Sequence, residues 1–131
     1  MQDDRVFESL KRGLKASSMK HDIVAENIAN LSTPGYSSKA LNFKAMMADK
    51  VSGNLPMAVT SGNHIVFNDE NIIRNLFVYY PDNTKINDKG NNVDVDKEMV
   101  KMKENNTYYN ALAAILKRKY GLHRTAISGR V

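Results

Sequence analysis

The stretch AENIANLSTPGYSS, residues 25–38, indicates a helix that ends abruptly in a rigid turn. Asn27 and Asn30 lie three residues apart on one face of the helix end. There an asparagine can bond freed backbone groups or take the left-handed conformation that ends a helix. Pro34 disfavours a helical residue before it, and Gly35 tolerates positive φ, so Pro-Gly predicts a type II turn. The stretch is therefore predicted to be an elbow that fixes the angle between a long helix and the chain that follows.

The segment upstream of the turn, residues 4–31, has the spacing of a coiled-coil helix. Its apolar residues recur in alternating steps of three and four once Ser17 and His21 occupy the two middle positions. The predicted seam consists of Phe7, Leu10, Leu14, Val24, Ile28 and Leu31. The two polar positions cost stability but can fix the register of a helix pair.

The C-terminal part repeats this pattern from Asp94 to Tyr120, or as far as Ile127. Acidic residues at its start and basic residues near its end suit the helix dipole, while Gly121 either stops or bends the helix. Its predicted seam consists of Val95, Met99, Met102, Tyr109, Ala113, Leu116 and Tyr120, with Asn106 as a polar member. A second apolar row, roughly 100° around the helix, consists of Tyr108, Leu112, Ile115 and Leu122.

The middle of the chain differs in composition, because it is rich in Gly, Asn, Pro and strand-forming residues. Short strands are predicted at residues 57–60, 65–67 and 76–80. The expected fold is mainly α, with two long terminal helices paired in a coiled-coil-like core and a small irregular or β-containing middle region. The expected divisions are residues 1–39 for the N-terminal core helix and elbow, 40–92 for the middle region, and 93–131 for the C-terminal core helix.

The second apolar row of the C-terminal helix favours assembly. One partner helix covers only a narrow stripe, so this row must meet either the middle region or another subunit. Each buried Leu or Ile side chain is worth about 1.5–3 kcal/mol, which makes an uncovered row a substantial loss. An ordinary helical core with the middle region packed onto it fits the seam spacing alone equally well.

Composition excludes several classes of function. The 131 residues suffice for one domain, and 42% of them are apolar. The chain has no cysteine, which rules out disulfides, thiolate zinc sites and a cysteine nucleophile. The three histidines are scattered, and no catalytic, metal, cofactor or phosphate motif is recognisable, so we expect a protein that is not an enzyme and needs no cofactor. We expect neither a secretory signal at the N-terminus nor insertion into lipid.

The elbow resembles the N-terminal signature of the bacterial flagellar axial proteins, in which Asn-hydrophobic-Ala-Asn precedes Thr-Pro-Gly-Tyr. The matching residues are Asn27, Ile28, Ala29, Asn30, Thr33, Pro34, Gly35 and Tyr36. The position before the signature is often a further Asn in that group, and here it is Glu26. The departure leaves the rest of the signature intact.

The C-terminal part narrows this resemblance to the rod proteins of the flagellar basal body, and within them to the proximal rod proteins. That family shows Asn-Val-Asp-Leu-Asp-x-Glu-Met, then a Tyr-x-Ala-Leu core and a basic-aromatic-Gly ending. The matching residues are Asn92, Val93, Asp94, Asp96, Glu98, Met99, Tyr109, Ala111, Leu112, Tyr120 and Gly121. Val95 stands where Leu is common.

The resemblance implies a structural subunit of the flagellar rod, the hollow drive shaft that crosses the periplasm. It implies export without a cleaved signal, and terminal helices that form the inner tube of the shaft. It also implies contacts with further copies, with neighbouring rod proteins, and at the rod base with the adaptor of the membrane ring and the export gate.

The alternative is a monomeric helical adaptor that binds an acidic protein through its basic C-terminal end. The basic residues concerned are Lys117, Arg118, Lys119, Arg124 and Arg130. The same residues make the best case for nucleic-acid binding, but a net charge of +5 on 131 residues is small for that role, and we expect no nucleic acid.

Overall fold

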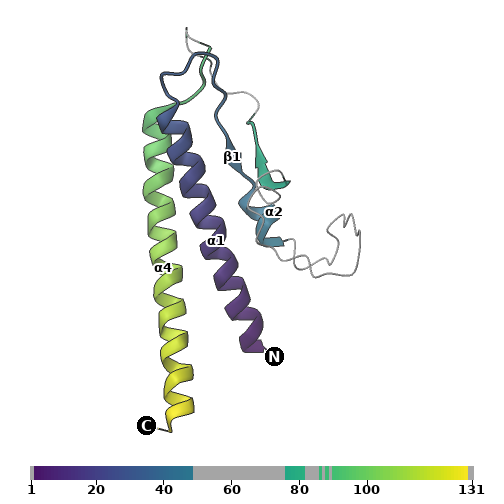
Figure 1. Cartoon of the computed structure of the whole chain (residues 1–131), viewed down its shortest axis with the longest axis vertical. Helices are drawn as coiled ribbons and strands as arrows, with labels where there is room; N and C mark the ends of the chain where they lie inside the picture. The colour runs from purple at the N-terminus through teal and green to yellow at the C-terminus, as the bar shows by residue number, and fades with distance from the viewer. Residues whose placement is uncertain (1, 49–75, 82–85, 87, 89, 130–131) are drawn as a thin grey trace.

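The computed structural model is mainly helical and describes residues 2–48, 76–81, 86, 88 and 90–129. Two long helices run antiparallel, α1 over Gln2–Ala29 and α4 over Val95–Ser128 (Figure 1). The short elements are β1 (Ala40–Leu41), α2 (Phe43–Ala48) and β2 (Val78–Tyr79). They lie beside α1, so α1 is a middle layer with α4 on one side and the short elements on the other. The predicted fold class is confirmed.

The start of α4 follows the local signals in its sequence. Asp94 is the N-cap, and its side chain accepts a hydrogen bond from the backbone N–H of Lys97 at 3.2 Å. That bond holds the pKa of the Asp94 carboxyl below its ordinary value. Asp96 and Glu98 follow in the first turn, where carboxylates suit the positive end of the dipole. The helix continues through Gly121 without a break and ends at Ser128.

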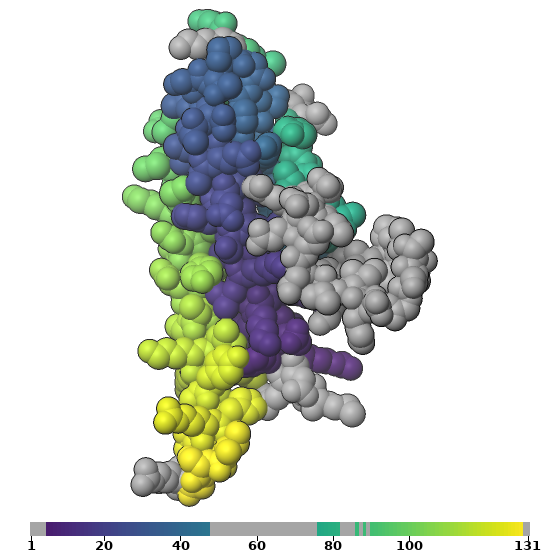
Figure 2. Space-filling model, viewed as in Figure 1, coloured from purple at the N-terminus to yellow at the C-terminus, as the bar shows by residue number. Residues whose placement is uncertain are grey.

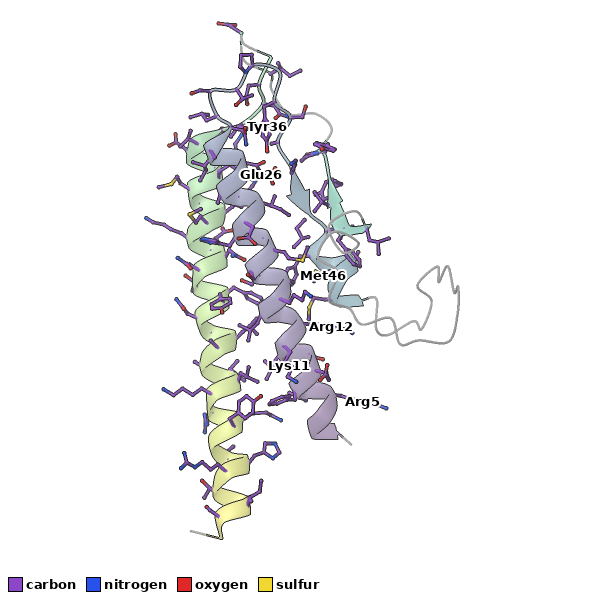
Figure 3. All side chains as sticks on the ribbon, viewed as in Figure 1. Arg5, Lys11, Arg12, Glu26, Tyr36 and Met46 are labelled. Atoms are coloured by element: carbon purple, nitrogen blue, oxygen red, sulfur yellow. The ribbon has the colours of Figure 1, made fainter. Side chains whose placement is uncertain are left out.

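The main apolar core lies between α1 and the short elements. Ala16 and Met19 of α1 pack there against Met46 of α2 and Phe77. Figure 3 shows Met46 of α2 beside α1. Burying such side chains contributes about 1.5–3 kcal/mol each. Leu41, Phe43 and Ala45 pack around the core.

The two short strands pair antiparallel, with Ala40 opposite Tyr79 and Leu41 opposite Val78. Of the predicted strand at 76–80 only these two residues of β2 are extended, because Leu76 and Phe77 are helical and Phe77 enters the core. Neither β1 nor α2 was predicted. The predicted strands at 57–60 and 65–67 lie outside the described residues.

Polar pairs occupy the contact line between α1 and α4. The hydroxyl of Ser17 donates to Oδ1 of Asn105 at 2.9 Å, and Nδ2 of Asn105 donates to the carbonyl of Ser17 at 2.8 Å. All of these groups are buried. Because an unmatched buried amide or hydroxyl is costly, this reciprocal pair specifies one register for the two helices.

The far end of α4 extends past the beginning of α1. Figure 2 shows the C-terminal end of the chain protruding beyond the start of α1. Every described side chain from Gly121 to Gly129 is exposed. α4 is thus longer than its intramolecular partner can cover.

Candidate functional site

The elbow at the end of α1 has the predicted geometry. The backbone N–H of Tyr36 donates to the carbonyl of Thr33 at 3.3 Å, and Gly35 has φ of +71°. A four-residue turn with Pro at its second position and positive φ at its third is of type II. Any side chain at Gly35 would strain the backbone, because positive φ is unfavourable for residues with a Cβ.

Asn27 is the centre of a buried hydrogen-bonded group that we call the Asn27 cluster, made of Asn27, Tyr36, Lys39 and Glu98. Its Nδ2 donates to the carbonyl of Lys39 at 2.8 Å and to Oε2 of Glu98 at 3.1 Å. Its Oδ1 accepts from the backbone N–H of Lys39 at 2.9 Å and from the Tyr36 hydroxyl at 3.1 Å. Both donors and both acceptor positions of the amide are used, and the side chain is 0% exposed. One amide therefore joins α1, the chain leaving the elbow, and α4.

Charged side chains lie within and beside the Asn27 cluster, and the pKa values of its members Lys39 and Tyr36 are both raised. Lys39 forms an ion pair with Glu26, and this hydrogen bond raises the pKa of the Lys39 ammonium. Burial, and then the negative charge of Glu26, raises the pKa of the Tyr36 phenol. Lys101 contacts the other carboxylate oxygen of Glu98 at 2.6 Å. Glu26 and Tyr36 both lie at the elbow end of the molecule in Figure 3.

A groove of about 930 Å³ opens beside the cluster, between the start of α4 and β1. Four lysines line it: Lys20, Lys39, Lys97 and Lys101. Three of these pair with carboxylates, namely those of Glu26, Asp94 and Glu98. The groove is consequently close to neutral and is not built as an anion site.

The signature residues differ in their surroundings. Asn27 is buried, and Ile28, Asn30 and Tyr36 are half-buried. The amide of Asn30 donates to the carbonyl of Glu26 at 2.8 Å and accepts from the Thr33 hydroxyl at 3.2 Å. The exposed members are Ala29, Thr33, Pro34 and Gly35. The signature thus combines a buried anchor with an exposed turn.

The two buried residues of α4 each lie one position before a predicted seam member. The residues that α1 covers most fully are Glu98 and Asn105, each directly before a predicted seam member. Of those members, Met99 is 49% exposed, and Asn106 is exposed as well. The reason is physical: Glu98 and Asn105 have bonded partners on α1, so they occupy the contact line and turn the apolar residues to its flank.

Other predicted seam residues remain in the neighbourhood of the contact. On α1, Leu10 and Val24 are buried, whereas His21 is exposed. The rings of Phe7 and Tyr120 meet edge to face with centroids 4.7 Å apart. The half-buried members are Phe7, Leu14, Ile28, Leu31, Val95, Met102, Ala113 and Leu116. Tyr109 and Tyr120 are 41% and 54% exposed, so each keeps about half of its surface open.

The second apolar row of α4 is divided between the chain itself and solvent. Tyr108 meets Phe43 edge to face with centroids 5.5 Å apart, and Leu112 lies close to Gly13 of α1. Ile115 and Leu122 are 49% and 64% exposed. Tyr108 and Leu112 of this row thus contact other parts of the same chain, whereas Ile115 and Leu122 are largely exposed to solvent.

No three His, Asp or Glu side chains within the described ranges come together in a way that could hold a metal ion. Across the same ranges, none of the helices combines the length and the apolar character that crossing a bilayer requires.

Sequence reasoning did not identify the buried polar residues of the site. Asn91, which contacts the elbow, and Asn105 were not singled out, and Glu98 was noted only as a first-turn acid suited to the helix dipole and as a family match. An apolar pattern cannot identify such residues, because their burial depends on partners far away in the sequence. The single available signal was Ser17, a polar residue at a seam position.

Comparisons with known proteins agree with this arrangement. A family model described as flagella basal body rod protein matches residues 7–36, which cover most of α1 and the elbow. The flagellar basal body rod protein FlgB of Bacillus subtilis is 31% identical over 123 residues, covering 94% of this chain and 93% of that protein.

Further relatives carry the same name. FlgB of Agrobacterium fabrum is 31% identical over 121 residues, covering 89% of this chain and 88% of that protein. FlgB of Salmonella typhimurium is 27% identical over 113 residues, with 81% and 80% covered. Similarity at this level extends along nearly the whole chain, including both helices and the elbow between them. The chain therefore belongs to the FlgB family of flagellar basal body rod proteins.

Proposed function

We propose that this protein is a non-enzymatic subunit of the flagellar rod and that it assembles through the faces of its terminal helices that its own chain leaves open. The observation that carries the proposal is the state of α4. In residues 106–129, all of which the structure describes, no side chain is fully buried. Exposed apolar residues in this range are Tyr108, Tyr109, Ile115, Tyr120, Leu122 and Ile127.

The energetics favour coverage of these faces by neighbours. Fully burying a Leu or Ile side chain contributes about 1.5–3 kcal/mol, so covering Ile115 and Leu122 alone gives a substantial gain. The two flanks of α4 point in different directions, because Tyr109 and Tyr120 lie on one side of the α1 contact and Ile115 on the other. One subunit therefore offers surfaces to at least two neighbours.

Charge adds to this proposal. After Glu104 the chain contains no acidic residue, while Lys117, Arg118, Lys119 and Arg124 are all basic. A helix half with one sign of charge suits a neighbour that supplies carboxylates at the rim of the contact. The monomeric adaptor that would use the same basic residues has no support from the relatives, which are named as rod proteins.

Membership of the family supports finer assignments, which we also propose. We place the protein in the rod within the periplasm, after export without a cleaved signal. Its neighbours there are further copies, adjacent rod proteins, the adaptor of the membrane ring and the export gate. The open seam and second row are the surfaces we assign to these contacts, with the elbow fixing the direction in which the middle region leaves them.

The test is the double variant Ile115→Asp/Leu122→Asp in a motile bacterium that depends on this protein. Both side chains are exposed, so the free energy of unfolding of the isolated protein should change by no more than about 0.5 kcal/mol per site. Cells should lose motility, and their basal bodies should lack a rod, although the variant still reaches the periplasm.

Asn110→Asp is the matched control, because it adds a negative charge at an exposed polar position of the same helix. Cells with the control should swim. Normal swimming by the double variant would refute the proposed use of these faces. A double variant that unfolds in isolation is detected by circular dichroism, and the single changes then replace it.

A further inference from the structure

We infer that Asn91 is the residue that positions the elbow, by binding carbonyl groups of the turn just after α1 with its side-chain amide. Asn91 lies outside the segment matched by the family model and 58 to 61 positions after the residues whose carbonyls it binds. The inference concerns the isolated protein and does not depend on what that protein assembles with.

The geometry is that of a turn held by a side chain from a distant part of the sequence. Nδ2 of Asn91 lies 3.0, 2.9 and 3.0 Å from the carbonyl oxygens of Asn30, Leu31 and Thr33. Its Oδ1 accepts from the backbone N–H of Val93 at 2.7 Å. The side chain is 1% exposed, so these bonds are formed away from water.

The elbow needs such a donor. The last carbonyls of a helix have no partner within the helix, and a following left-handed residue usually supplies N–H groups to them. Here the chain after α1 contains Pro34, which has no N–H to give. The turn itself supplies the N–H of Thr33 to the carbonyl of Asn30 at 3.0 Å and the N–H of Tyr36 to the carbonyl of Thr33 at 3.3 Å. The amide of Asn91 is a second donor to these two carbonyls and also binds that of Leu31, so it ties the turn to the residues before α4.

The next residue holds the other side of the elbow. Oδ1 of Asn92 accepts from the backbone N–H of Ser38 at 2.6 Å. Asn91 therefore binds the chain where it leaves α1, and Asn92 binds it where it leaves the turn. The elbow takes its angle only when the residues immediately before α4 dock against it. The turn after α1 and the start of α4 therefore become ordered together.

The test compares Asn91→Ala with Asn91→Asp by hydrogen exchange of the purified full chain. In Asn91→Ala the amides of Thr33 and Tyr36 should exchange about tenfold faster than in the wild type, since a lost bond of about 1.4 kcal/mol has that effect. Amides of α1 at residues 17–24 should keep their protection.

Asn91→Asp separates the donor role from the filling of space. Aspartate has the size and shape of asparagine, but its carboxylate has no N–H and faces three carbonyl oxygens. It should therefore accelerate exchange at the elbow more than Asn91→Ala does. Protection at the elbow equal to the wild type in Asn91→Asp would overturn the inference.

Asn110→Ala is the control, because that asparagine is exposed on α4. Its elbow amides should exchange as in the wild type. If the Asn91 variants do not fold, the wild-type protein still decides the matter by NMR. The side-chain NH₂ of Asn91 should exchange with water far more slowly than that of Asn110, and equal rates would overturn the inference.

Discussion

The two halves of the α1–α4 pair are held in different ways. Near the elbow the contacts are buried and polar, with the Asn27 cluster at one level and the Ser17–Asn105 pair at the next. Toward the chain ends they are apolar and shallow, as in the edge-to-face contact of Phe7 with Tyr120. The contact between the same two helices thus changes within a few turns, from buried hydrogen bonds between specific partners to partly exposed apolar packing.

The difference separates two tasks. A buried amide or carboxylate tolerates one arrangement of partners, because any other leaves a group unpaired at a cost of about 1–3 kcal/mol. Apolar contacts lack this directionality, so they can form with a neighbour as well as with α1. The elbow half fixes the shape of the subunit, and the terminal half keeps its surface available.

The largest effect is expected from Asn27→Ala. It removes an amide that makes four hydrogen bonds to three residues, and it leaves the partly buried backbone N–H and carbonyl of Lys39 without these bonds. The free energy of unfolding should fall by about 2–4 kcal/mol, measured by urea denaturation. Asn110→Ala, at an exposed site, should change it by less than about 0.5 kcal/mol. Similar values for both variants would remove the distinction between the two halves.

A smaller effect should distinguish two glycines within the helices. A Cβ at Gly13 would lie 2.8 Å from Cδ1 of Leu112, whereas a Cβ at Gly121 would meet nothing within 4 Å. Gly121→Ala should therefore stabilise the protein by up to about 1 kcal/mol, the usual gain in helix propensity. In Gly13→Ala that gain should be offset by displacement of Leu112. Thermal unfolding of the two variants measures the difference, and an equal gain would show that the helices are not in close contact at Gly13.

The smallest effect is a loss of stability in alkaline solution. The pKa values of Tyr36 and Lys39 are both raised above their ordinary values of 10.0 and 10.5, so the folded state holds these protons more tightly. Their contribution is complete below the ordinary values and is lost as pH rises through the raised ones. The free energy of unfolding should decline in that range.

Urea denaturation from about pH 8 to about pH 11.5 would follow this loss. Tyr36→Phe should make the decline shallower, since the phenol no longer titrates. Tyr109→Phe, on the exposed flank of α4, is the matched control and should leave the decline as steep as in the wild type. An unchanged decline in Tyr36→Phe would show that burial at the elbow does not contribute.

Local signals in the sequence predicted the long helices and the turn correctly. Heptad spacing located α1 and α4, and Pro34 with Gly35 defined a turn that needs no distant partner. The burial of Glu98 and Asn105 could not be predicted in this way, because their partners Asn27 and Ser17 are far away in the sequence. The strand β1 escaped prediction since a two-residue strand carries no alternation, and it depends on β2 to form.

The place of α1 between two layers has a mechanical consequence for a subunit of the flagellar rod. α4 and the short elements each pack against α1. Among the described residues, the ring contact of Tyr108 with Phe43 joins α4 directly to the short elements. We therefore expect a load applied to α4 to reach the strands chiefly by way of α1. The stiffness of this one helix, and of its anchorage at Asn27, sets how much the subunit twists under load.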